Sequence, residues 1–151
     1  MMNAAAGFIL ASVGLVHAEI GDTLTQAIAR YGQPVKQYQL FDGIEFIFVK
    51  DGLGVTLHFG AGSTADYIGY FKTDLKGGLS NEEIERCLKA NGVFTEFPAP
   101  SKEQRTWVAG NNVLLAVYGP NPHSGPSLEI STAEMIQKRF QQMMLKGSDK
   151  P

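Results

Sequence analysis

Residues 44–59 read IEFIFVKDGLGVTLHF, and the alternation of apolar and polar side chains in this segment predicts a β-hairpin. The pair Asp51-Gly52 favours a two-residue type I′ turn, which fixes the register of the two strands. In that register six apolar residues share one face: Ile44, Phe46, Phe48, Val55, Leu57 and Phe59. A slip by one residue would scatter them over both faces, so we expect this face to be buried against helices.

The opposite face of the hairpin is mixed in character. It places Glu45 across from His58 and Ile47 across from Thr56. We interpret these four residues as candidate contacts for a reversible protein interaction, because such interfaces combine polar and aliphatic groups. An acid–base couple of Glu45 and His58 is the catalytic alternative. An ordinary cross-strand pair is favoured, since an open sheet face offers no pocket that would shift either pKa.

Three capping boxes predict where helices begin. In a capping box a Ser or Thr hydroxyl accepts from the amide three residues later, while a Glu or Gln side chain reaches back. The boxes are TLTQ at residues 23–26, SNEE at residues 80–83 and STAE at residues 131–134. They open helices that we predict over residues 23–31, 80–91 and 132–146. Gly32 and Gly92 follow the first two helices, as expected at helix ends.

The order of the predicted elements repeats along the chain. The hairpin and a strand over residues 66–72 follow the first helix. The strands after the second helix are predicted over residues 105–109, 113–118 and 127–130. We therefore predict a two-layer α+β fold of tandem αβββ units, over residues 19–75 and 76–131, with a C-terminal helix. Strands joined by hairpins give a mostly antiparallel sheet, on which the helices pack.

Residues 1–18 (MMNAAAGFILASVGLVHA) have the pattern of a secretory signal peptide. They contain no Asp, Glu, Lys or Arg, and their apolar core ends in Val16-His17-Ala18, which fits a small-x-small cleavage site. The apolar core is too short to cross a bilayer about 30 Å thick. A buried N-terminal helix is the alternative. We predict cleavage before Glu19, export to the periplasm or the medium, and a mature single domain over residues 19–151 with no integral membrane segment.

Composition and residue types exclude several classes of function. A net charge of −2 with mixed signs gives no basic face for nucleic acid. Once His17 is removed, one Cys and two His remain, which are too few for a typical zinc site. Cys87 shares a helical face with Ile84 and Leu88, and this spacing predicts a buried, inert thiol. We expect no catalytic residue, no cofactor and no metal.

Three aromatic residues lie near the second predicted hairpin: Phe94, Phe97 and Trp107. Aromatic side chains in an irregular segment are candidate interface anchors. They are equally suited to the core of a small domain, and the core interpretation is favoured. The chain as a whole is expected to be a non-catalytic interaction module with a protein partner in the cell envelope. A small hydrolytic enzyme without a local motif is the alternative, and the oligomeric state is left open.

Residues 21–34 read GDTLTQAIARYGQP and resemble the opening of the SmpA/OmlA-type envelope proteins, which include the small lipoprotein of the barrel-assembly machinery. The family motif is a Gly, a Thr shortly before an aliphatic residue, and an apolar residue followed by Gly-x-Pro. The same αβ unit occurs in tandem in the β-lactamase-inhibitor-like fold. The resemblance implies an exported, non-enzymatic module that binds proteins. This chain departs from the pattern because it lacks a lipidated Cys and a Gly-x-Pro ending in its second half.

Overall fold

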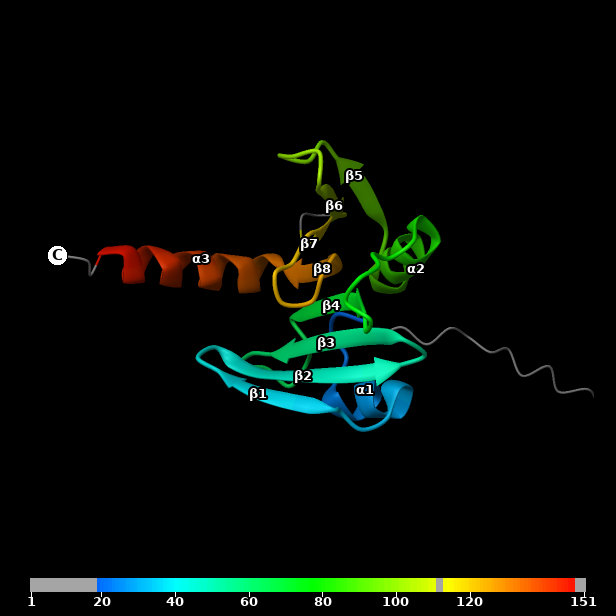
Figure 1. The fold of residues 1–151 in the computed structure, drawn as a ribbon. Coiled ribbons are helices and arrows are strands. Elements are labelled where there is room, and N and C mark those ends of the chain that lie inside the picture. The colour runs from blue at the N-terminus through cyan, green and yellow to red at the C-terminus, as the bar shows by residue number, and fades with distance from the viewer. Residues whose placement is uncertain (1–18, 111–112, 149–151) are drawn as a thin grey trace, which may run out of the picture.

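The computed structural model describes residues 19–110 and 113–148, which form an α+β fold (Figure 1). Its helices are α1 (Leu24–Tyr31), α2 (Asn81–Asn91) and α3 (Ala133–Ser148). Its strands are β1 (Lys36–Leu40), β2 (Gly43–Lys50), β3 (Leu53–Phe59), β4 (Tyr67–Lys72), β5 (Phe94–Phe97), β6 (Arg105–Ala109), β7 (Leu114–Gly119) and β8 (Ser127–Thr132). The predicted fold class is confirmed. The predicted signal peptide and the turn at Asn111-Asn112 lie outside the described residues.

The strands form one antiparallel sheet in the order β1-β2-β3-β4-β8-β7-β6-β5. The first half of the sheet follows α1 and the second half follows α2, and the halves meet where β4 pairs with β8. Each half thus contains four strands, where the sequence predicts three. The two additional strands, β1 and β5, are the edges of the sheet. The alternation of apolar residues does not predict these two strands, because β1 (KQYQL) exposes four of its five residues and β5 has only four residues.

The first hairpin has the predicted register. Phe46 pairs with Leu57 and Phe48 with Val55, and the other predicted pairs are present as well. Asp51 and Gly52 have φ values of 52° and 77°, both in the left-handed region that a type I′ turn requires. The hairpin prediction succeeds because the turn chemistry and the apolar pattern specify the same register.

Both α1 and α2 cover the same face of the sheet. Tyr31 on α1 contacts Phe48, with ring centroids 5.8 Å apart, and Asn91 on α2 donates to the Tyr70 hydroxyl at 3.0 Å. Phe48 and Tyr70 are both paired with Val55, so their side chains share one face. The buried residues of both helices belong to a single hydrophobic core. The other face of the sheet remains for contacts with α3 or with solvent.

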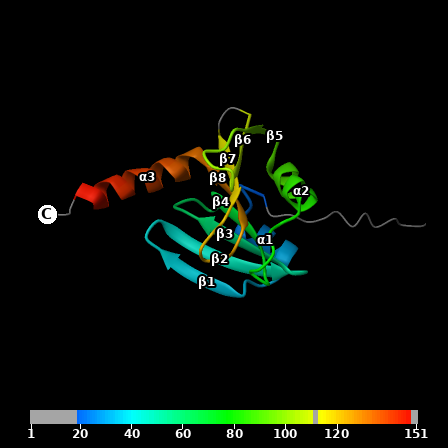
Figure 2. The ribbon, with the colours of Figure 1, turned by 45° about the horizontal axis from the view of Figure 1, so that its top comes forward.

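The C-terminal helix α3 extends away from the sheet in Figures 1 and 2. It continues directly from β8, which runs to Thr132. The N-cap is therefore Thr132, whose hydroxyl accepts from the Met135 amide at 3.2 Å. The predicted capping box places the N-cap at Ser131. That position is wrong by one residue, because the hydroxyl that accepts from the helix amide belongs to Thr132.

Candidate functional site

The four candidate contacts on the first hairpin lie on the sheet face opposite α1 and α2. Glu45 pairs with His58 and Ile47 with Thr56, as predicted. Ile47 and Thr56 are half-buried. The face is less open than the sequence suggests, because residues from α3 and from the turns at its edge crowd it. The expectation that this face leaves the pKa of Glu45 unshifted is wrong. Burial raises that pKa, although the charge of Arg139 on α3 opposes the effect.

His58 lies buried between two carboxylates and is only 1% exposed. Its Nδ1 lies 2.6 Å from Asp66 Oδ1, and its Nε2 lies 3.2 Å from Asp42 Oδ1. Each ring nitrogen thus lies within hydrogen-bond distance of one aspartate oxygen. The partners of His58 are therefore these aspartates, and not Glu45 across the strand. This burial leaves His58 without surface for a partner protein.

The same cluster attaches α3 to the sheet. Arg139 on α3 donates from Nε to Asp42 Oδ2 at 3.1 Å. Burial alone would raise the pKa of Asp42, but the hydrogen bond and charge of Arg139, together with the charge of His58, hold this pKa below its usual value. We define the His58 cluster as Asp42, His58, Asp66 and Arg139. It connects the end of β3, the start of β2 and the second turn of α3.

Sequence reasoning identifies His58 in this cluster but not its three partners. Asp42 and Asp66 lie just before β2 and β4. Arg139 lies on α3, 81 residues after His58 in the chain. The strand order could have indicated the two aspartates. Asp42 and Asp66 each precede a strand that pairs with β3, so both lie close to the final residues of β3. Nothing in the local pattern indicates Arg139.

A second polar group occupies the middle of the same face. Glu129 on β8 accepts from Asn121 Nδ2 at 2.7 Å and from Ser127 Oγ at 3.1 Å. Burial raises the pKa of the Tyr67 hydroxyl far above its usual value, and the negative charge of Glu129 and a hydrogen bond to it add to the shift. The Arg139 guanidinium lies 5.7 Å from the centre of the Tyr67 ring. Tyr67 therefore keeps its proton, and Glu129 has donors within the protein.

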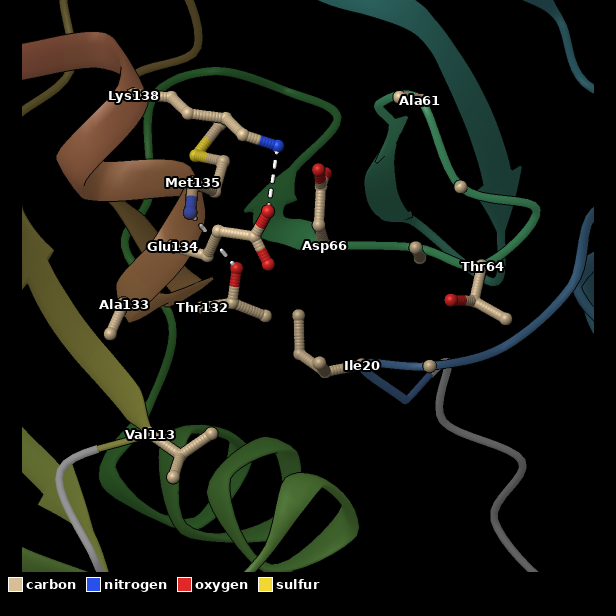
Figure 3. A pocket seen from close by; sticks show the side chains of 13 residues that line it. Ile20, Ala61, Thr64, Asp66, Val113, Thr132, Ala133, Glu134, Met135 and Lys138 are labelled. Carbon is tan, nitrogen blue, oxygen red and sulfur yellow. Dashed lines mark hydrogen bonds and ion pairs between the residues drawn. The ribbon is translucent and has the colours of Figure 1, made fainter. Parts of the chain in front are cut away.

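Figure 3 shows a pocket of about 560 Å³ beside the start of α3. Three of its polar side chains interact within the protein. Glu134 accepts from Lys138 at 2.8 Å, Thr132 caps α3, and Asp66 belongs to the His58 cluster. The Glu134 pair is exposed, and the hydrogen bond from Lys138 lowers the pKa of Glu134. Glu134 therefore lacks the raised pKa that would suit a carboxyl group for general acid chemistry.

The distal part of α3 carries an exposed apolar stripe. Met135 is buried and Arg139 is directed to Asp42, so this side of the helix faces the body. Met144 lies nine residues after Met135, which is about two and a half turns and places it on the opposite side. Phe140 and Met144 are 58% and 63% exposed. We define these two residues as the α3 stripe.

The three predicted aromatic contacts do not form one surface. Trp107 is 5% exposed, belongs to the core and lies under the Arg105 guanidinium, 4.7 Å from the ring centre. Phe94 is half-buried and packs against the core. Phe97 is 50% exposed, and it pairs with Thr106 on the face opposite that of Trp107. Of the three, Phe97 alone offers substantial surface to a partner.

Cys87 is buried in the core on α2, as predicted. Burial raises the pKa of this thiol to about 12, so it stays protonated and unreactive.

Within residues 19–110 and 113–148, no group of three or more His, Cys, Asp and Glu side chains is arranged to hold a metal ion. In the same ranges, no helix is both long and apolar enough to span a membrane.

No family model matches the chain, and no curated protein matches it. A solved structure with a similar arrangement is that of the DUF4309 family protein YjgB from Bacillus subtilis, at 16% sequence identity and a TM-score of 0.44. The alignment covers 80% of this chain and 83% of that protein. The predicted resemblance to the SmpA/OmlA-type proteins is wrong, because the solved structure that matches is a DUF4309 family protein and no SmpA/OmlA family model matches. Residues 24–31 form a capped helix, and the motif that suggested the resemblance reflects the requirements of helix ends.

Proposed function

We propose that this protein is an exported, non-catalytic module that binds a partner protein through the α3 stripe. The observation that carries the proposal is the orientation of α3. Its charged residue Arg139 faces the sheet, whereas the apolar Phe140 and Met144 face solvent. An amphipathic helix that packs on its own domain has the opposite orientation. Exposed apolar side chains on a projecting helix are expected where another surface covers them.

The residues around the stripe favour a groove on a partner protein, and not a membrane surface, as the binding site for α3. Helices that bind membrane surfaces use free Lys and Arg side chains to meet anionic lipids. Of the α3 cations whose side chains the structure describes, Lys138 pairs with Glu134 at 2.8 Å and Arg139 pairs with Asp42. Gln137 and Gln141, which follow the stripe around the helix, are exposed and uncharged. An apolar groove lined by hydrogen-bonding groups is complementary to this helix.

The way α3 is attached to the sheet suits a helix that binds a partner protein. Two contacts hold the start of the helix: the Thr132 cap with buried Met135, and the Arg139 side chain in the His58 cluster. Beyond Arg139 the helix continues to Ser148, which adds more than two turns. A helix fixed at its base loses less conformational freedom on binding than a disordered segment would.

The polar groups of the sheet support the hydrolase alternative less well than the α3 stripe supports an interaction module. The sheet face that carries Tyr67, Glu129 and His58 has several titratable groups, as active sites do. However, the Tyr67 pKa is raised so far that it cannot act as a base near neutral pH. Glu129 and His58 interact with neighbouring side chains within the protein. We therefore assign these groups to the attachment of α3 and to the sheet.

The proposal is tested by measuring affinity for a purified partner. The chain is cross-linked in its native envelope, the captured protein is identified and purified, and its Kd is measured by titration calorimetry. The double variant Phe140→Ser, Met144→Ser should raise the Kd at least tenfold, because hot-spot side chains carry most of the binding energy. The control Val93→Ser removes an apolar side chain that is even more exposed and lies outside α3, and it should leave the Kd unchanged.

Three results would overturn the proposal. One is an unchanged Kd for the stripe variant together with a raised Kd for Ile47→Ser, which would assign binding to the sheet face. Another is self-association of the free chain that the stripe variant abolishes, detected by sedimentation velocity. The last is binding to vesicles of anionic lipid that depends on Phe140, which would make a membrane the occupant.

A further inference from the structure

The first described residues are held by contacts to two separate elements. The Ile20 amide donates to Asn91 Oδ1 on α2 at 2.8 Å. The Gly21 amide donates to the Ala65 carbonyl at 2.9 Å, and the Ala65 amide donates back to the Asp22 carbonyl at 2.8 Å. Ile20 also packs against the core. The chain is therefore fixed in place from its second predicted mature residue onward.

The backbone nitrogen of Glu19 occupies a charged site. It donates to Asp22 Oδ2 at 3.0 Å, and Arg30 Nη1 donates to the same oxygen at 2.8 Å. Asp22 is only 5% exposed, so its carboxylate is removed from most of the water. A peptide N–H at this position supplies one neutral hydrogen bond. The buried carboxylate could also accept from a positively charged donor, which makes a stronger bond.

We infer that Asp22 forms a binding site for the α-ammonium group of Glu19, which exists only after the chain is cleaved before this residue. Hydrolysis of the Ala18–Glu19 peptide bond consumes one water and leaves a carboxylate on Ala18 and an ammonium on Glu19. The nitrogen is already 3.0 Å from Asp22 Oδ2, so no rearrangement is needed. The inference rests on the proposed export, since a signal peptidase performs this cleavage.

The charges around this site balance after cleavage. The two cations are the new ammonium and Arg30, whose Nη1 also lies 3.9 Å from Glu19 Oε1. The two anions are the carboxylates of Asp22 and Glu19. The Tyr70 hydroxyl on β4 is a further titratable neighbour. Burial raises its pKa most, and the charges of Cys87, Tyr31 and Asp22 add to the effect. The unprocessed chain has one cation and two anions at the same place.

The site predicts how stability changes with pH. An α-amino group titrates near about pH 8 in an unfolded chain. A carboxylate partner raises the folded-state pKa, so the stabilisation is fully present below about pH 8 and is lost as pH rises through the folded value. Loss of stability between about pH 8 and 10 thus reports on the ammonium.

The experiment compares the chain beginning at Glu19 with a free amino terminus and the same chain acetylated at that terminus. All described elements lie within this chain. Acetylation should lower Tm at pH 7, and the difference should disappear at pH 10. In the Asp22→Asn background, acetylation should leave Tm unchanged at both pH values. If that variant does not fold, NMR titration of the Glu19 α-amino group in the unsubstituted chain should give a raised pKa.

Equal Tm values for the free and acetylated chains at pH 7, or an α-amino pKa at its unfolded value, would overturn the inference. N-terminal sequencing of the natively exported chain decides the processing separately. A first residue other than Glu19 in the native protein would remove the export proposal as stated, while the Tm comparison would still measure the Asp22 site.

Discussion

Glu45 and His58 are cross-strand neighbours, yet their side chains meet different groups. His58 interacts with Asp42 and Asp66, whereas Glu45 is affected most by burial and then by Arg139. The sequence predicts the pairing of these two residues because the Asp51-Gly52 turn fixes it. It does not predict their partners, because those come from turns and from a distant helix. Residue-level roles on this face thus depend on tertiary contacts that a strand pattern does not contain.

Substitution of the apolar hairpin face tests the register at single residues. Phe46 is nearly buried, and Phe46→Ala should lower the free energy of unfolding by about 3–5 kcal/mol because it leaves a cavity in the core. Val49→Ala on the exposed face should change it by less than about 0.5 kcal/mol. Urea unfolding of both variants measures the difference, and equal losses would mean that the register is wrong.

The lowered pKa of Asp42 gives a pH-dependent prediction. Its ionised form stabilises the fold above the unfolded value of 3.8, and this stabilisation is lost as pH falls through the lower folded value. Arg139→Gln removes the cation that lowers the pKa, so the variant should be less stable than the unsubstituted chain at pH 7. The gap should narrow as pH falls below about 4.

Urea unfolding at pH 7 and pH 3 measures this gap. The neighbouring variant Lys138→Gln is the control, because its side chain pairs with Glu134 at the surface of the same helix. Surface pairs of this kind contribute little to stability. Equal effects of the two substitutions at pH 7 would show that the His58 cluster does not hold α3.

Elements with strong local signals are the ones that the sequence predicts well. Both capping boxes on α1 and α2 are present, and each helix ends at the expected glycine. The edge strand β1 has no such signal, because its side chains are mostly polar and exposed. For α3 the helix is predicted but its orientation is not. An apolar stripe at helical spacing suggests packing on the domain, whereas here Phe140 and Met144 face solvent.

The start of α3 provides a test at the level of elements. Thr132→Ala should lower the free energy of unfolding by about 1 kcal/mol, because the Met135 amide loses its cap. Ser131→Ala should have a smaller effect, since its hydroxyl does not cap the helix in this arrangement. The reverse order of the two losses would place the N-cap at Ser131, as the capping-box pattern predicts.

At the scale of the whole molecule, two halves with the order helix and four strands share one antiparallel sheet and one core. The repeated order is predictable because each half begins with a capping box and contains a hairpin. The junction of β4 with β8 is not predictable, since it pairs residues about 60 positions apart. Joining the halves buries one face under α1 and α2. It leaves α3 as the element that projects from the body (Figure 2).

We propose that the α3 stripe contacts a partner protein in the cell envelope. A photoreactive phenylalanine analogue placed at position 140 and activated in intact cells tests this contact directly. We expect a cross-link from position 140 to one defined protein, and none from position 93, although Val93 is more exposed than Phe140. A cross-link from position 47 or 56 without one from position 140, or a position-140 product that contains only a second copy of this chain, would contradict it.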